Sequence, residues 1–229
     1  MSASAYAQLR DLVARSSAPL WEPPGDEAFD ARAARPAAVL ILFGVLDAHP
    51  AERPARHAAV SRDLDVLLLT RAATLRSHPG QVAFPGGRVD DGDRGPVDAA
   101  LREAEEETGL DPAGVEVLGP LADLALPFSR HRVTPVIGWW ADPSPVYAVD
   151  RAESENVFRA PVADLLDPAH RYTWALARGG ATHTGPAWRL DVDGSPRLVW
   201  GFTAGVLDRL FATLGWEEPW DPTRRISLP

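Results

Sequence analysis

The sequence predicts one domain of the α/β (α+β) class, a sandwich in which helices cover a mixed β-sheet. Two apolar runs, at residues 38–46 and 65–70, are typical of buried strands. Two other segments, 96–108 and 202–214, repeat apolar residues with helical spacing. Strands and helices do not alternate strictly along the chain, which favours a mixed sheet. We find no internal repeat or linker, and therefore expect residues 1–229 to form a single domain with N- and C-terminal extensions.

The other elements are expected from the same patterns. Leu9, Leu12 and Val13 stand at helical spacing near the N-terminus. Stretches rich in Pro, Gly and Asp indicate loops, and short apolar runs indicate strands. In chain order, we expect a helix at 5–13, loops at 18–30 and 47–62, and strands at 115–118, 133–140 and 155–158.

Composition excludes several classes of function. The net charge is −9, whereas a protein that grips nucleic acid needs a basic surface. There is no cysteine, so disulfides, thiolate metal sites and thiol nucleophiles are all excluded. The longest apolar run, residues 37–46, is too short to span a bilayer, and the N-terminus lacks the pattern of a secretory signal. We therefore expect a cytoplasmic protein with a small-molecule substrate, without nucleic-acid or membrane partners.

The most informative segment is the acidic helix predicted at 96–108. Pro96 suits its first turn and Gly109 the position just beyond its end. Glu103, Glu106 and Glu107 are spaced by three and four residues, so their carboxylates share one face and repel one another. A divalent cation would relieve this repulsion, and ligands that are all oxygen suit Mg²⁺ or Mn²⁺. Alone, such a glutamate run is more often a solvated helix face.

The context of the helix favours a site. A loop with Gly86, Gly87 and three aspartates, Asp90, Asp91 and Asp93, precedes it, and paired glycines let the backbone approach a ligand closely. Arg102 lies four residues before Glu106 and can pair with it.

Residues 87–110 resemble the signature of the Nudix hydrolase family. Gly87 opens the motif, and residues 102–110, REAEEETGL, close it without a mismatch. Asp93 stands where the family usually has Glu, and the spacer to Arg102 is one residue longer, as in the branch that hydrolyses coenzyme A. The family resemblance implies a Nudix-type α/β/α sandwich with a mixed sheet.

The same resemblance implies catalytic roles. Glu103, Glu106 and Glu107 would bind Mg²⁺ or Mn²⁺, with the backbone carbonyl of Gly87 as a further ligand, and Arg102 would orient the carboxylates. Metal ions would neutralise the diphosphate and activate a water molecule. The general base would be a glutamate of the motif or a carboxylate outside it. The outside candidates, near the strand expected at 155–158, are Glu153 and Glu155.

Residues 68–87 resemble the additional signature of coenzyme A pyrophosphatases, and the whole resemblance covers about residues 65–168. Ala72 replaces the serine of that signature, whereas its other positions remain. Coenzyme A carries a 3′-phosphate beside its diphosphate, and arginine and histidine side chains bind phosphate. The expected substrate-binding residues are Arg71, Arg76, His78 and Phe84, with Arg130 or Arg132 as further phosphate contacts.

The expected reaction is hydrolysis of coenzyme A, or its derivatives, to 3′,5′-ADP and 4′-phosphopantetheine. A Nudix diphosphatase for ADP-ribose or a dinucleotide is the alternative, and Pro127 lies near a proline found in ADP-ribose enzymes. A Nudix-fold nucleotide sensor without activity would usually have lost the glutamates that are intact here. Phe84, Trp139 and Trp140 could stack on adenine, although a core or interface position is the better interpretation of the two tryptophans. The sequence does not predict the oligomeric state.

Overall fold

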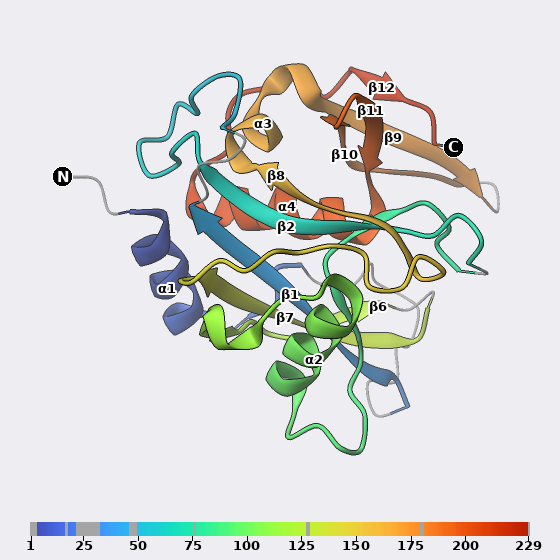
Figure 1. Cartoon of the computed structure of the whole chain (residues 1–229). Coiled ribbons are helices and arrows are strands. Elements are labelled where there is room, and N and C mark those ends of the chain that lie inside the picture. Colours follow the sequence, from blue (N-terminus) through green and yellow to red (C-terminus); the bar gives the residue numbers. More distant parts are fainter. Residues whose placement is uncertain are drawn as a thin grey trace.

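The structure is a computed structural model and describes residues 4–16, 18–21, 33–45, 50–75, 77–126, 129–178 and 181–228. A mixed sheet forms the centre of the molecule (Figure 1). Among the described strands, its path runs β3 (Val82–Ala83), β2 (Leu64–Arg71), β1 (Arg35–Val45), β7 (His131–Trp140) and β5 (Val115–Pro120). Three strands pair beside this path: β4 (Gly86–Arg88) with β1, β6 (Leu124–Leu126) with β7, and β8 (Ser154–Pro161) with β2.

The register of the sheet determines which residues meet at the site. β1 and β7 run parallel, with Arg35 opposite His131, whereas β2 and β4 are both antiparallel to β1. β4 pairs with the first half of β1, and β2 pairs with its end. Since β1 and β2 are buried on both faces, they read as continuous apolar runs rather than as alternating patterns.

Helices cover both faces of the sheet, which makes the fold an α/β/α sandwich of the α+β kind (Figure 1). On one face, helix α2 (Pro96–Thr108) packs through the small side chains of Ala99, Ala100 and Ala104 against Leu40 and its neighbours. On the other face lie α1 (Ala5–Arg15) and α4 (Gly201–Leu214). No helix in the described part of the chain is long and apolar enough to cross a membrane.

A second sheet follows the first in the C-terminal third. It is not among the elements expected from the sequence. Its strand order is β11 (Ser195–Val199), β10 (Ala181–Val192), β9 (Arg171–Arg178) and β12 (Arg225–Ile226). The short helix α3 (Val162–Leu166) precedes it, and the buried Trp188 of β10 donates a hydrogen bond from Nε1 to the carbonyl of Leu165 at 2.5 Å. Thr203 of α4 also donates to the carbonyl of Val82 in β3, which ties the C-terminal third to the first sheet.

The expected elements agree closely with the structure. The helix at 96–108 has the predicted bounds, and those at 5–13 and 202–214 differ from them by one or two residues. The strands expected at 38–46, 65–70, 115–118, 133–140 and 155–158 are all present, each one to four residues longer or shifted at an end. Residues 50–62 form a loop without helix or strand, as expected. Residues 22–30 and 47–49 of the two expected loops lie outside the described residues.

Candidate active site

Glycines delimit the acidic helix at both ends. Gly95 precedes Pro96 at the N-terminus of α2 with φ of 145°. Gly109 ends the helix in the left-handed conformation, and its N–H donates to the carbonyl of Glu105 at 2.9 Å. The loop at 89–95 then connects this helix directly to β4.

Two glutamates of α2 converge on the paired glycines of β4. The backbone N–H of Gly86 donates to Oε2 of Glu107 at 2.9 Å. A Cβ atom built on Gly87 would lie 2.4 Å from Cδ of Glu103, so this carboxylate packs directly against the glycine. Gly86 has equally little room, because a Cβ there would lie 2.3 Å from the carbonyl oxygen of Ala38. Only glycines therefore permit this contact between helix and strand.

Arg102 holds the acidic groups around it in place. Its guanidinium donates to both carboxylate oxygens of Asp93 at 3.0 Å, and to Glu103 and Glu106 at 3.1 Å each. A further bond at 3.0 Å reaches the backbone carbonyl of Arg88 in β4. The pairing of Arg102 with Glu106 is as predicted, and Asp93 provides the carboxylate at the position where the family usually has Glu. The arrangement joins loop, helix and strand.

Burial changes the proton affinity of these carboxylates. Burial raises the pKa of Glu107 to about 7, opposed by the N–H of Gly86 and reinforced by the charge of Glu103. Burial also raises the pKa of Glu103, although Arg102 acts against it. By contrast, the hydrogen bonds from Arg102 lower the pKa of Asp93. A carboxylate near neutrality in a site of like charges is typical of a functional centre.

The donor atoms fit a hard divalent cation. Among the described residues, no three carboxylate or imidazole groups lie close enough to share one ion as they stand. Glu106 is instead hydrogen-bonded to Arg102. Mg²⁺, however, keeps several water ligands and needs only one or two carboxylates. Glu103 and Glu107 supply two half-buried or buried oxygen donors beside the Gly86–Gly87 backbone.

The end of β2 brings a cation to the same place. The charge of Arg71 lowers the pKa of Glu107, so the guanidinium lies near that carboxylate. Its Nε is buried and has no hydrogen-bond partner among the described residues. His78 is exposed in the loop between β2 and β3, and its Nδ1 lies 3.0 Å from Oε1 of Gln81. Arg76 lies outside the described residues.

The two candidate bases occupy different surroundings. The charge of Glu153 raises the pKa of Glu107, and the Glu153 carbonyl accepts a hydrogen bond from Ala72, the residue after Arg71, at 2.9 Å. Glu155 instead pairs with Arg197 of β11 at 3.2 Å. Glu153 therefore lies within electrostatic range of Glu107 in the acidic helix, whereas Glu155 is connected with the C-terminal sheet.

Several expected contacts have other surroundings. Phe84 is 3% exposed and packs in the core on the α4 side of the sheet, which leaves its ring no open face for adenine. Trp140 is a core residue, and Trp139 makes an edge-on contact with Tyr6, as the core interpretation predicted. Arg132 pairs with Asp123 at 3.1 Å. Arg130 is exposed, and Pro127 lies outside the described residues.

Sequence reasoning missed the two backbone groups that complete the arrangement. The N–H of Gly86 and the carbonyl of Arg88 contact Glu107 and Arg102, respectively. Their role depends on pairing between β4 and β1, and a strand of three residues gives little signal in sequence.

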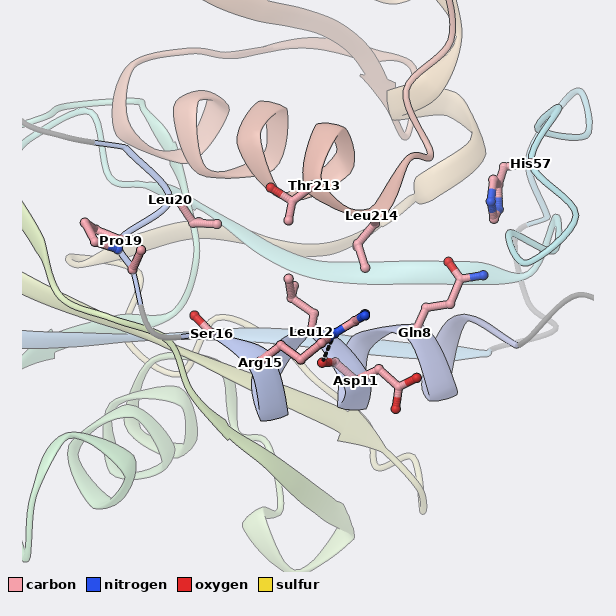
Figure 2. Close-up of a pocket in the computed structure, with 11 residues that line it drawn as sticks. Gln8, Asp11, Leu12, Arg15, Ser16, Pro19, Leu20, His57, Thr213 and Leu214 are labelled. Atoms are coloured by element: carbon pink, nitrogen blue, oxygen red, sulfur yellow. Dashed lines mark hydrogen bonds between the residues drawn. The ribbon is translucent and has the colours of Figure 1, made fainter.

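A separate hollow of about 640 Å³ lies between α1 and α4 (Figure 2). Its charged lining residues include Asp11 and Arg15, and Arg15 Nε donates to the backbone carbonyl of Asp11 at 3.1 Å. The hollow lies on the opposite side of the sheet from α2 and its glutamates. It therefore takes no part in the candidate site.

Comparison with known proteins identifies sequences and structures that are similar to this chain. An uncharacterized Nudix hydrolase named NudL, from Escherichia coli O7:K1, is 39% identical over 150 residues, which are 66% of this chain and 75% of the relative. Two solved structures are each 20% identical. An Ap4A hydrolase from C. elegans aligns over 57% of this chain and 83% of its own, with a TM-score of 0.42. The NUDIX domain of Shewanella oneidensis NrtR, complexed with ADP ribose, aligns over 68% and 84%, with a TM-score of 0.40.

The profile of the NUDIX domain matches residues 51–175. This range is more than half of the chain and includes β2, the paired glycines, the acidic helix and Glu153. Nudix hydrolases in general use divalent metal ions such as Mg²⁺ or Mn²⁺. The chain belongs to the Nudix family.

Proposed function

We propose that this protein hydrolyses the diphosphate of coenzyme A, or of its derivatives, to 3′,5′-ADP and 4′-phosphopantetheine. The observation that supports this most is the position of Arg71, whose Nε is buried without a hydrogen-bond partner in the described part of the chain and whose charge acts on Glu107. An unpaired guanidinium next to a metal-binding carboxylate is suited to a phosphate oxygen. We further propose that residues 1–229 form one domain that acts in the cytoplasm.

The acidic helix would hold the metal. Glu103 and Glu107 would bind Mg²⁺ or Mn²⁺, together with the carbonyl of Gly87 and, once released from Arg102, Glu106. The bound ion would neutralise the diphosphate and lower the pKa of the attacking water. Phosphoryl transfer depends mainly on position and charge, so the chain needs no covalent nucleophile.

Arg102 would act as a positioning residue. It bonds to Asp93, Glu103 and Glu106 together, and these contacts fix the carboxylates against β4. Because its guanidinium is already occupied, it is a poor candidate for a direct substrate contact.

Glu153 is the better of the two outside candidates for the general base. It lies near Glu107 and is connected to the Arg71 segment through Ala72, whereas Glu155 is paired with Arg197. A carboxylate next to the metal ligands, but not needed as one, can accept a proton from water.

Arg71, Arg76 and His78 would select the substrate, with Phe84 supporting this segment from the core. A diphosphatase for ADP-ribose or a dinucleotide would use the same glutamates. Additional phosphate-binding side chains would contribute less to the binding of its substrate. The two functions therefore differ in the substrate and not in the metal site.

A substrate panel tests the proposal. Purified protein is incubated with Mg²⁺ or Mn²⁺ and, in separate reactions, coenzyme A, ADP-ribose, NADH and a dinucleoside polyphosphate, and the products are identified by mass. We expect 3′,5′-ADP from coenzyme A at the highest kcat/KM, with no product after chelation of the metal. Cleavage of the other substrates but not of coenzyme A would refute the substrate assignment and leave the metal site intact.

A further inference from the structure

Two arginines and a histidine to which the motif assigns no role lie together at one end of the sheet. They are Arg35 at the start of β1, Arg88 at the end of β4 and His131 at the start of β7. Arg35 is directly opposite His131, and Arg88 is opposite Ala37, two residues along β1 from Arg35. Because residues two apart on a strand point to the same face, all three side chains share one face of the sheet.

This face is the one opposite α2. Gly87, the neighbour of Arg88, faces α2, because a Cβ atom there would meet Glu103. Alternation along β4 therefore directs Arg88 to the other side. Among the described strands, β4 pairs with β1 only, so β4 is an edge strand. The glutamates of α2 lie on one side of it, and Arg35, Arg88 and His131 lie on the other.

The two arginines are unpaired and line a hollow. Within the described ranges, neither guanidinium has an ion pair or a hydrogen bond, and both side chains are exposed. The hollow has a volume of about 470 Å³ and is lined by Arg35, Pro36, Arg88, Val89, Asp90 and Asp91. Oδ2 of Asp90 lies 3.8 Å from a guanidinium nitrogen of Arg102, so Arg102 partly neutralises the charge of this carboxylate.

The field around His131 is positive. Burial lowers the pKa of His131 most, and the charges of Arg35, Arg88 and His78 lower it further. His78, on the loop that follows Arg71, therefore lies within electrostatic range of the same cluster.

We propose that Arg35, Arg88 and His131 form a subsite for a phosphomonoester of the substrate, distinct from the diphosphate that is cleaved. The proposal rests on the proposed function, in which this group is the 3′-phosphate of coenzyme A. The diphosphate would lie at the glutamates, and the monoester would reach the opposite face around the edge strand β4. Guanidinium groups bind such dianions through paired hydrogen bonds.

Comparison of coenzyme A with 3′-dephospho-coenzyme A tests the subsite. We expect the wild type to prefer coenzyme A and the Arg35→Ala/Arg88→Ala variant to lose that preference. Loss of one charged hydrogen bond corresponds to about tenfold in affinity, so kcat/KM for coenzyme A should fall by about 100-fold in the double variant. The value for the dephospho substrate should change less than about threefold, which is below the effect of one such bond.

Two matched variants exclude a general effect of charge or folding. Arg209→Ala removes an exposed arginine from α4 and should keep the wild-type preference. Arg35→Lys/Arg88→Lys keeps the charge without the guanidinium and should restore part of the preference. An equal loss on both substrates in the alanine variant would overturn the subsite.

Binding without catalysis separates this inference from the proposed function. Calorimetry with adenosine 3′,5′-bisphosphate and 5′-AMP, without metal, should show tighter binding of the bisphosphate by the wild type and equal binding by the double alanine variant. That result together with no cleavage of coenzyme A would support the subsite and refute the function. Equal binding of both nucleotides by the wild type would overturn the subsite even if coenzyme A is cleaved.

Discussion

Replacing Glu107 by glutamine separates the stability of the fold from the chemistry of the site. Glu107 is 9% exposed, and its Oε2 accepts a hydrogen bond from Gly86 at 2.9 Å. A glutamine has nearly the same shape and can accept the same hydrogen bond, but it cannot ionise. The substitution therefore removes a charge from the site without leaving a cavity.

The size of the effect follows from the pKa. Burial raises the pKa of Glu107 from 4.5 to about 7, so the folded protein holds a proton that the unfolded chain releases. The free energy of unfolding of the wild type therefore falls as pH rises from 4.5 to 7. Above pH 7 the cost of burying the ionised carboxylate is present in full. At 1.36 kcal/mol for each pH unit, this cost is about 3 kcal/mol, which the variant does not incur.

Urea unfolding of the metal-free proteins at pH 5 and pH 8 measures this difference. We expect Glu107→Gln to be more stable than the wild type at pH 8, by up to about 3 kcal/mol, and nearly equal at pH 5. Mg²⁺ should stabilise the wild type but not the variant, and the variant should lack turnover. Glu105→Gln, an exposed neighbour on the same helix, is the matched control and should change neither property. A variant that is less stable at pH 8 would refute the argument from burial and pKa, and a variant that retains turnover would refute the metal assignment.

Further substitutions test the glycine contact, the general base and a buried carboxyl group. Gly87→Ala places a Cβ atom 2.4 Å from Cδ of Glu103, so we expect turnover to fall at least about tenfold with the fold intact by circular dichroism; unchanged turnover would contradict this geometry. Glu153→Gln should lower kcat about 100-fold at nearly constant KM, and Glu155→Gln much less, so equal losses would exclude Glu153 as the base. Asp65 is 1% exposed, neither of its carboxylate oxygens has a hydrogen-bond partner among the described residues, and burial raises its pKa to about 7. The free energy of unfolding of the wild type therefore falls as pH rises from 3.8 to 7. Thermal unfolding of Asp65→Asn should show a weaker decline with pH, and the variant should be more stable than the wild type by up to about 4 kcal/mol at pH 8. A pH profile equal to that of the wild type would contradict this.

The sequence predicted the elements whose packing is local. The acidic helix carries its own start, end and apolar stripe, and each of the two central strands contains a continuous apolar run, so pattern alone located them. The C-terminal sheet was missed because β9 and β10 mix polar and apolar residues. Their pairing and burial depend on contacts that are not local in sequence, such as the hydrogen bond from Trp188 to the carbonyl of Leu165, 23 residues earlier.

The candidate site was predictable to a similar extent. The glutamates and Arg102 follow from spacing on one helix, and the Arg102–Glu106 pair is confirmed. The position of Glu153 near Glu107 depends on β8 pairing with β2, and spacing could not distinguish it from Glu155. Phe84 was expected to bind substrate because its motif contains it, yet the ring is in the core, which only the three-dimensional packing reveals.

A competition reaction between two substrates tests the proposed hydrolysis of coenzyme A. The wild-type protein is given equal concentrations of coenzyme A and ADP-ribose with Mg²⁺, and both sets of products are followed by mass in the same tube. We expect 3′,5′-ADP and 4′-phosphopantetheine to form first, while ADP-ribose is largely intact. Preferential loss of ADP-ribose would contradict the assignment of the Arg71–His78 segment to coenzyme A.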